Sequence, residues 1–342
     1  MIDVSIIVPI FNKERFLKDC LDSLINQTYK NIEIICINDG STDHSLDILR
    51  DYADKDDRLI IISQENKGAG NARNTGIKIA TGRYLQFLDA DDFFELDMLE
   101  DMVKQADEKK ADIVICNALE YNEETKIEEA HRWLNVQDLK LDVFSYHDVE
   151  NIFNITTSSV WNKLYKKELI IDNEIWYQEI PSNNDTVFSV ITLLLAKRIT
   201  YVDKFYIHYR YYNDTFRISS SREKYMQCSV MAYKKIIKVM KEKRMYGEVQ
   251  DLLNQQMYNS ANYELAFCDD EAAGKAFLRQ MCRLMSGTRR IKLRYRYEGY
   301  SSLRYFYLFG KIPFLTSIIL EKRKIFYLFN CIPLSVKRGY KG

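Results

Sequence analysis

The sequence IEIICINDGSTD, residues 32–43, joins a short run of β-branched residues to a polar turn. Its first half, Ile32–Ile37, has the length and composition of a buried strand. Its second half, Gly40–Asp43, supplies residues that favour a tight turn and then cap a helix. This stretch therefore predicts a strand, a polar turn and a helix in that order, and the same order recurs on both sides of it.

Alternation of strands and helices extends over the first half of the chain. Strands are expected at residues 4–9, 32–37, 59–62, 84–88 and 112–116, and helices at about 16–25, 68–80, 96–109 and 185–196. Short connections between them predict an α/β fold with a mostly parallel sheet covered by helices on both faces. Residues 118–150 are expected to be irregular, residues 198–212 to form one or two strands, and residues from about 222 to be helical.

The composition excludes several classes of protein. Apolar residues make up 46% of the 342 residues, which is enough for a core and excludes a disordered chain. The 49 basic and 49 acidic residues cancel overall. Residues 283–342, however, hold 14 Lys and Arg against 2 Asp and Glu. This tail therefore has a net charge of +12, and the rest of the chain has a net charge of −12. A basic tail on an acidic body is not a uniform nucleic-acid coat, so no nucleic-acid partner is expected.

Features of secreted and membrane-spanning chains are missing from the sequence. No run approaches the roughly 20 apolar residues of a spanning helix. The N-terminal residues have neither the basic region nor the cleavage site of a secretory signal. The seven cysteines are odd in number and form no C-x-x-C pair, which predicts free thiols in a reducing cytoplasm.

Paired acids follow the strand at residues 84–88. Asp89 and Asp91 would point into one crevice, because ligands of such sheets bind at the carboxyl ends of the strands. Two carboxylates that face each other repel, and a divalent cation such as Mg²⁺ or Mn²⁺ removes that repulsion while sharing its shell with phosphate oxygens. A turn that caps a helix is the alternative for this D-x-D pattern. Its position in line with Asp39, after the second strand, favours the metal site.

Two further segments near the same edge suit a nucleotide. Asp39 can accept from a base or a ribose hydroxyl, with a capping turn as the alternative. The loop Asn66–Asn74 is Gly-containing and leads into a helix, so its amides together with Lys67 and Arg73 suit a diphosphate. It matches neither the G-x-G-x-x-G fingerprint nor a P-loop.

Two residues in the second half are candidates for chemistry. Asp185 lies at the start of a predicted helix, where it is either an N-cap or a general base. His208, in the aromatic run Tyr206–Arg210, is either a structural residue or a third metal ligand or phosphate contact.

The ordered motifs together resemble the family-2 glycosyltransferases of the GT-A fold, in particular bacterial members that build capsule, lipopolysaccharide or exopolysaccharide. The resemblance covers about residues 1–215 and rests on these motifs: Val8–Glu14, Asn38–Asp43, Asn66–Gly76, Phe87–Asp92, Trp161–Tyr165, Asn184–Phe188 and Tyr206–Arg210.

The resemblance implies roles for individual residues. Those expected at the nucleotide sugar are Phe11, Asn12, Glu14, Asp39, Lys67, Arg73, Asp89 and Ala90. Asp91 is expected to hold the metal and diphosphate, with Asp89 and His208 as further metal ligands. Asp185 falls where the family's Glu-Asp pair supplies the catalytic base, and here that pair is Asn184-Asp185.

The expected activity is therefore a metal-dependent inverting transfer of a sugar from a nucleotide-diphosphate donor. UDP-hexose or UDP-N-acetylhexosamine is the expected donor, and a glycan or lipid-linked hydroxyl is the expected acceptor. A non-catalytic nucleotide-sugar binder remains an alternative. A sugar-nucleotide pyrophosphorylase is less favoured, since residues 9–12 are not the Gly-rich basic loop that it needs after the first strand.

Two domains are expected, a GT-A catalytic domain over residues 1–215 and a helical, basic-aromatic C-terminal region over 216–342. Residues 306–314 recur as 326–334, and the tail that contains them, residues 283–342, combines aromatic and basic side chains. Such side chains favour an anionic membrane surface, so the protein is expected in the cytoplasm, attached peripherally to the inner face of the cell membrane. Packing of the tail on the catalytic domain is the alternative, and a homodimer is left open.

Overall fold

The computed structural model describes most of the chain. The residues described are 2–131, 139–212, 222–265, 268, 270–285, 300–308, 312–320, 323–328 and 332–338. They form two compact units. The first holds the described residues up to 212 together with 231–252, and the second holds 222–230 together with the described residues from 253 onward. The predicted domain boundary near residue 215 stays a prediction.

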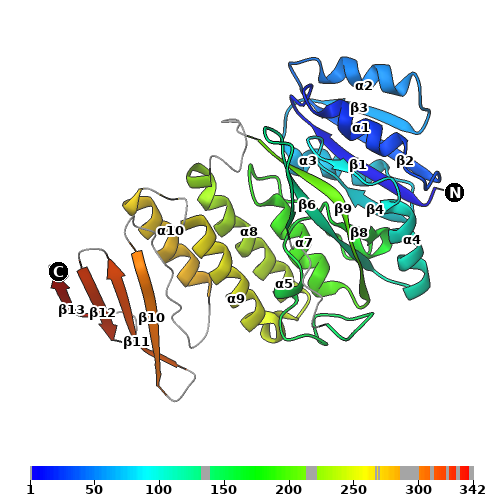
Figure 1. Cartoon of the computed structure of the whole chain (residues 1–342). Coiled ribbons are helices and arrows are strands. Elements are labelled where there is room, and N and C mark those ends of the chain that lie inside the picture. The colour runs from blue at the N-terminus through cyan, green and yellow to red at the C-terminus, as the bar shows by residue number, and fades with distance from the viewer. Residues whose placement is uncertain are drawn as a thin grey trace. The chain divides into compact units, whose positions relative to one another are not determined.

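The first unit contains a sheet whose N-terminal part is wholly parallel (Figure 1). Its four strands are β1 (Val4–Ile10), β2 (Ile32–Asp39), β3 (Leu59–Gln64) and β4 (Tyr84–Phe87), in the order β3-β2-β1-β4. Every residue of β2 and β4 is buried, as expected for strands covered on both faces. All four strands were predicted from their short β-branched and aromatic runs.

The rest of this sheet mixes strand directions. It continues from β4 through β8 (Lys163–Lys166), β6 (Ile113–Asn122) and β9 (Ile199–Tyr211) to β5 (Phe93–Phe94), and β7 (Glu128–His131) pairs with β6. β6 and β9 are parallel, whereas β8, β5 and β7 are antiparallel to their neighbours. Because the longest ladders are the parallel ones, the prediction of a mostly parallel sheet is confirmed.

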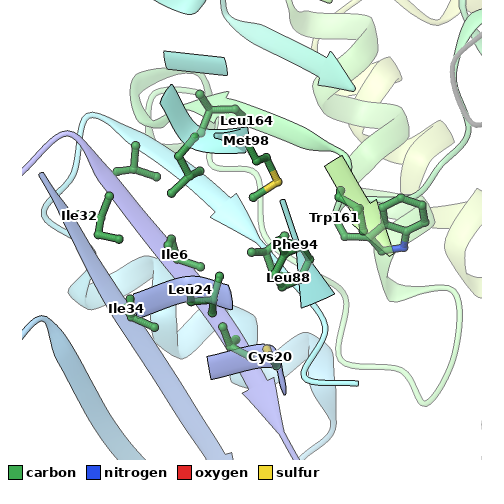
Figure 2. Packing of buried hydrophobic residues seen from close by; sticks show 14 of the residues in the cluster. Ile6, Cys20, Leu24, Ile32, Ile34, Leu88, Phe94, Met98, Trp161 and Leu164 are labelled. Carbon is green, nitrogen blue, oxygen red and sulfur yellow. The ribbon is translucent and has the colours of Figure 1, made fainter. Parts of the chain in front are cut away.

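Helices cover both faces of the parallel strands. Alternate strand residues point to opposite faces, and Ile6, Ile32 and Ile34 form one buried cluster with Cys20, Leu24 and Met98 (Figure 2). That face is covered by α1 (Leu17–Ile25), α2 (Ser45–Ala53) and α4 (Met98–Lys109).

The opposite face is covered by α3 (Ala69–Ile79) and α7 (Asn184–Leu195). Ile7 lies so close to Gly76 of α3 that an added Cβ would meet its side chain at 2.5 Å. Phe87 of β4 packs edge-on against Phe188 of α7 with ring centroids 5.1 Å apart. The two faces therefore both bury apolar side chains, which confirms the prediction from strand–helix alternation.

The expectation of an irregular segment at 118–150 is wrong for its first part. β6 runs on to Asn122 and turns back into β7, so that Ala118 pairs with His131 and Tyr121 with Glu128. Acidic residues in this hairpin interrupt the alternation of apolar and polar residues from which a strand would be predicted. Pairing with β9 supplies its backbone hydrogen bonds instead.

Helical structure in the C-terminal region is confirmed up to residue 284. This region contains α8 (Arg222–Glu242), α9 (Tyr246–Leu265) and α10 (Glu271–Leu284). Two short helices, α5 (Ile152–Ile155) and α6 (Lys167–Ile171), lie earlier in the chain. Asp270 caps α10, since its Oδ1 accepts hydrogen bonds from the amides of Ala272 and Ala273.

The tail differs from the helical expectation. It forms an antiparallel sheet of β10 (Tyr300–Leu308), β11 (Ile312–Leu320), β12 (Arg323–Leu328) and β13 (Ile332–Arg338), in chain order. The repeat with its offset of 20 residues corresponds to two successive hairpins, β10–β11 and β12–β13. Its β-branched and aromatic composition favours strands over helices.

Two other expectations concern the chain as a whole. Six cysteines lie in the described residues, and all six are free thiols. Cys331 lies outside them. Of the helices in the described part of the chain, none combines the length and apolar character that a bilayer crossing requires.

Candidate active site

The loops that follow β1, β2 and β4 adjoin at one edge of the sheet. β1 lies between the other two and runs parallel to both, with Ile10 opposite Asn38 and Ile7 opposite Phe87. The carboxyl ends of the three strands therefore meet at the same edge, and this is where such sheets bind ligands. Most of the residues predicted to bind the nucleotide lie at the ends of these strands or in the loops after them, whereas Lys67 and Arg73 follow β3.

Asn12 and Glu14 join the loop after β1 to the loop after β2. Oδ1 of Asn12 accepts from the Thr42 amide at 2.8 Å, and Oε2 of Glu14 accepts from the His44 amide at 2.8 Å. Asn12 adopts a left-handed conformation with φ 51°, which asparagine tolerates better than most residues. The ring of Phe11 beside them is 45% exposed, so it presents a free face for stacking.

Asp39 is buried and holds the loop after β3. Its Oδ1 accepts from the Lys67 amide at 3.0 Å and from Nε2 of Gln64 at 2.7 Å, and its Oδ2 accepts from the Gly68 amide at 2.8 Å. Gly40 permits this close approach, because a Cβ there would lie 2.9 Å from the Asn66 amide nitrogen. The N-cap of α2 is His44, and Oδ1 of the preceding Asp43 accepts from the Ser45 amide at the start of the helix.

A polar cluster joins α3, the loop after β4 and the start of α7. Arg73 donates from Nη2 to Oδ1 of Asp89 at 2.7 Å and from Nη1 to Oδ1 of Asn184 at 3.0 Å. Its guanidinium also lies over the ring of Tyr177, 5.3 Å from the centroid. Burial acts to lower the pKa of Arg73, but Asp89, Tyr177 and Asp185 together more than offset it, so the pKa is raised and the guanidinium stays charged.

Gly70 allows α3 and α7 to approach closely enough for this cluster. A Cβ at Gly70 would lie 2.8 Å from the Gln178 carbonyl oxygen and 3.2 Å from Cβ of Asn184. The absence of a side chain therefore lets the first turn of α7 lie against α3. Residues more than 100 positions apart in the sequence are brought together by this contact.

Asp185 lies in the first turn of α7, as predicted, but it is not the N-cap. The N-cap is Asn183, and Oδ1 of Asp185 accepts from the Thr186 amide at 2.9 Å. Loss of water around the carboxyl raises the pKa of Asp185, Arg73 lowers it, and Asp89 raises it further, with a net rise. A carboxylate with a raised pKa is a stronger base, which suits proton abstraction.

Asp91 is paired with an ammonium that the sequence analysis did not single out. Nζ of Lys13 lies 2.6 Å from Oδ2 of Asp91, and the hydroxyl of Tyr212 donates to the same oxygen at 2.8 Å. Nζ of Lys13 also donates to the Tyr212 hydroxyl at 3.2 Å. Burial acts to lower the pKa of Lys13, but Asp91 and Tyr212 together outweigh burial, so the pKa is raised and Lys13 is a cation.

Arg210 fixes the backbone of the acidic loop and was also missed. Its Nε donates to the Asp91 carbonyl oxygen at 2.8 Å, and its amide donates to Oδ1 of Asp92 at 2.8 Å. Its Nη2 forms an ion pair with Asp19 at 2.7 Å, and Nη1 pairs with Glu123. Alternation along β9 places Arg210 and Tyr212 on the same face as His208, which is the signal that identifies them.

His208 pairs with glutamates of other segments and not with the acids of the D-x-D motif. Its Nδ1 is 2.7 Å from Glu128 Oε1 and its Nε2 is 3.0 Å from Glu95 Oε1, while its ring stacks on Phe93 at 4.3 Å. Both ring nitrogens are thus engaged by carboxylates other than Asp89 and Asp91. Its role as a metal ligand stays a prediction.

Lys67 and Ala90 complete the set of predicted residues. The Lys67 side chain is exposed at the end of the loop that Asp39 holds, and Ala90 is buried between the two acids of the D-x-D motif. Their contacts with a nucleotide stay predictions.

The donors at this edge fit a divalent cation. Asp91 already has a cation, the Lys13 ammonium, in contact with its carboxylate, and carboxylate oxygens are the ligands that Mg²⁺ and Mn²⁺ prefer. Among the residues that the structure describes, no three His, Cys, Asp or Glu side chains gather into a metal site. The fit is therefore to a cation held by one or two carboxylates together with phosphate oxygens of a substrate.

Comparison with known sequences identifies relatives of this chain. The model of the glycosyl transferase family 2 matches residues 5–172. The glycosyltransferase GlyG of Streptococcus pneumoniae is 34% identical over 216 residues, which cover 60% of this chain and 70% of GlyG. GlyA of the same species is 35% identical over 213 residues, and the match spans only 30% of its length.

A further relative is the poly(ribitol-phosphate) beta-glucosyltransferase of Bacillus spizizenii. It is 32% identical over 206 residues, which cover 58% of this chain and 30% of that protein. This chain thus corresponds to less than a third of the length of two of these relatives.

Solved structures confirm the GT-A fold. Residues 1–349 of Staphylococcus aureus TarS, in complex with UDP-GlcNAc, superpose with a TM-score of 0.67 at 22% identity, covering 83% of this chain and 82% of that one. The mannosyltransferase PcManGT of Pyrobaculum calidifontis, in complex with GDP-Man and Mn²⁺, gives a TM-score of 0.54 at 18% identity, with 81% and 74% covered. The motifs, the sheet with its ordered site loops, and the match to GlyG agree, and they make this chain a member of the glycosyl transferase family 2.

Proposed function

We propose that this chain is an inverting glycosyltransferase of surface-polysaccharide synthesis. It transfers a sugar from a nucleoside-diphosphate donor, UDP-hexose or UDP-N-acetylhexosamine, to a hydroxyl of a glycan or lipid-linked acceptor. The observation that carries this proposal is the placement of Asp185 beside the Arg73–Asp89 pair. A carboxylate of raised pKa and a guanidinium then face one reaction centre.

The ligands of the structural relatives support the choice of donor. The TarS structure contains UDP-GlcNAc, and the PcManGT structure contains GDP-Man. A poly(ribitol-phosphate) beta-glucosyltransferase among the sequence relatives supports a surface polymer as the acceptor. UDP is proposed as the nucleotide, in line with the UDP-GlcNAc bound in the TarS structure.

The proposed reaction is a single displacement at the anomeric carbon. The acceptor oxygen forms a bond to that carbon while the bond from the carbon to the diphosphate oxygen breaks, and the configuration inverts. Asp185 accepts the proton of the acceptor hydroxyl as the new bond forms. Arg73, fixed by Asp89 and Asn184, supplies positive charge close to the base.

The nucleotide is held by the loops at the strand ends. The exposed ring of Phe11 stacks on the base, and Asp39 orders residues 64–68 so that their loop faces the diphosphate. Asp91, with Asp89, would hold Mn²⁺ or Mg²⁺, which supplies positive charge to the leaving diphosphate when it is bound.

Replacing the proposed base tests this function. In Asp185→Asn the carboxylate is lost and the shape is kept, so transfer is expected to fall by about 10²–10⁴-fold. The measurement is the rate of UDP release from UDP-GlcNAc and UDP-glucose, with water or a glycan as acceptor. Affinity for UDP, measured by calorimetry, is expected to be unchanged.

A matched control is Asp172→Asn, which removes an exposed carboxylate at the end of α6. It is expected to leave the rate as in the wild type. Near-normal turnover by Asp185→Asn would remove Asp185 from the role of base. A wild-type chain that binds UDP but releases none from any donor would instead support the non-catalytic binder.

The tail is proposed to attach the enzyme to the inner face of the membrane. Residues 283–342 have a net charge of +12, and each Lys or Arg near an anionic leaflet contributes about 1 kcal/mol. This location suits an acceptor on a lipid carrier.

Vesicle co-sedimentation of the full chain tests the attachment. Binding to phosphatidylserine-containing vesicles is expected to weaken by about 30-fold in the double variant Arg323→Gln/Lys324→Gln, because the two lost charges contribute about 1 kcal/mol each. Lys234→Gln/Lys235→Gln in α8 removes the same charge from exposed positions outside the tail and serves as control. Equal binding by both double variants would reject the tail as the attachment site.

A further inference from the structure

Lys13 and Asp91 form a close ion pair at the carboxylate that is proposed to bind the divalent cation. Nζ of Lys13 lies 2.6 Å from Oδ2 of Asp91, shorter than the usual 2.7–2.9 Å of a charge-assisted N–H···O bond. Tyr212 donates to the same oxygen and accepts from the same ammonium. Nζ of Lys13, the Tyr212 hydroxyl oxygen and Oδ2 of Asp91 thus form a closed triangle of hydrogen bonds.

A divalent cation at Asp91 and this ammonium exclude each other. Mg²⁺ binds carboxylate oxygens at about 2.0–2.1 Å, so an ion on Oδ2 would lie within a few ångströms of Nζ. Like charges at that distance repel strongly in a partly buried site. One of the two cations has to leave Oδ2 when the other binds.

Lys13 is the member of the pair that can move. Its ammonium is at the end of a flexible four-carbon stem, and the side chain is 26% exposed, so water can receive it. Asp91 is held more firmly, because Arg210 donates to its carbonyl oxygen and to Oδ1 of the neighbouring Asp92.

We infer that Lys13 is an internal competitor of the divalent cation for Asp91, and that cation binding displaces its ammonium from Oδ2. Lys13 therefore keeps the acidic loop neutral and ordered without a metal, and it weakens cation binding to the loop. This inference rests on the proposed function, from which it takes the cation and its place at Asp91.

The test is the affinity of the full chain for Mn²⁺, without any nucleotide, followed by the electron paramagnetic resonance signal of free Mn²⁺. Lys13→Met keeps the aliphatic stem and removes the charge. Its affinity for Mn²⁺ is expected to be higher than that of the wild type by about tenfold or more, a gain of about 1.4 kcal/mol. Lys13→Gln, a second uncharged variant, is expected to change the affinity in the same direction.

A matched control separates competition from a general effect of charge. Lys18→Met changes the net charge equally, but Lys18 is exposed on α1 and makes no bond to Asp91. Its effect is expected to be well below that of Lys13→Met, because exposed charges are screened by salt. In an Asp91→Asn background the gain from Lys13→Met is expected to disappear, since the contested carboxylate is gone.

Two results would overturn the inference. One is an affinity of folded Lys13→Met and Lys13→Gln that equals or falls below the wild-type value. The other is an equal gain from Lys18→Met. Neither result bears on sugar transfer, which is measured separately by UDP release. If the wild-type enzyme releases UDP and Lys13→Met leaves the Mn²⁺ affinity unchanged, the proposed function is kept and the competition is rejected.

Discussion

Asp89 and Asp91 lie two residues apart in one loop, and different cations neutralise them. Asp89 pairs with Arg73, whose side chain is 7% exposed and is also fixed by Asn184 and by the ring of Tyr177. Asp91 pairs with Lys13, whose side chain is 26% exposed. One cation is buried in the framework of α3 and α7, and the other is a flexible side chain at the surface of the loop.

This difference separates a permanent partner from an exchangeable one. A planar guanidinium with several fixed bonds loses little entropy for each bond and has no route to water. An ammonium on a flexible stem recovers both rotamer freedom and hydration when it leaves. The Arg73 cluster is therefore suited to hold the proposed base in place, whereas the Lys13 pair is suited to give way to a ligand.

The largest effect that tests this comparison is on stability. Asp89→Asn leaves the buried Arg73 charge without its carboxylate, and we expect a loss of about 2–3 kcal/mol in the free energy of unfolding. Asp91→Asn leaves Lys13 free to turn to water, and we expect a loss of about 1 kcal/mol. Urea unfolding at pH 7 measures both.

A suitable control is Asp47→Asn, which removes an exposed carboxylate paired with Arg50. Its effect is expected to stay within about 0.5 kcal/mol. Losses of equal size in Asp89→Asn and Asp91→Asn would show that the two cations are held alike, and the contrast between the clusters would be wrong.

A smaller effect concerns Asp185, which lies beside the Arg73 cluster. Its folded pKa is raised above the ordinary 3.8, mainly by burial, so the folded state binds the proton more tightly than the unfolded state. Stability is then lost as the pH rises from about 3.8 through the folded pKa. Asp185→Asn has no such proton, so we expect it to be more stable than the wild type at pH 7.

The measurement is the difference in unfolding free energy between Asp185→Asn and the wild type across the acid range. The advantage of the variant should shrink as the pH falls through the raised pKa of Asp185 toward the ordinary carboxyl value of 3.8, and it should stay constant below that value. An advantage that does not depend on pH would mean that ionisation of Asp185 is not its source.

The parallel half of the sheet is predictable from the sequence because its strands bury both faces. Apolar runs such as Ile32–Ile37 fit neither a surface helix nor a loop, and the turns between them contain capping residues. The hairpin of β6 and β7 is not predictable in this way, since Tyr121 pairs with Glu128 and the pattern does not alternate. Its first strand, β6, is stabilised by pairing with the distant strand β9.

The residues of the candidate site likewise divide into those that the sequence predicts and those that only the structure reveals. Asp39, Asp89, Asp91 and Asp185 are visible in the sequence because they lie in short motifs at the ends of predicted strands or at the start of a predicted helix. Lys13 lies between two motif residues with nothing to distinguish it, and Arg210 lies in an aromatic strand. Both become significant only when the strand-end loop and β9 meet at Asp91.

The sequence by itself determined the order of strands and helices, the edge at which the polar residues gather and the family of the chain, because these depend on local periodicity and short motifs. Only the tertiary structure decided which charge neutralises which acid. A pairing such as Arg73 with Asn184 or Lys13 with Asp91 joins residues that are far apart in the chain, and it is set by how closely helices and strands pack, as at Gly70. Electrostatic pairing depends on distance in space and on burial, and neither is encoded at a single position.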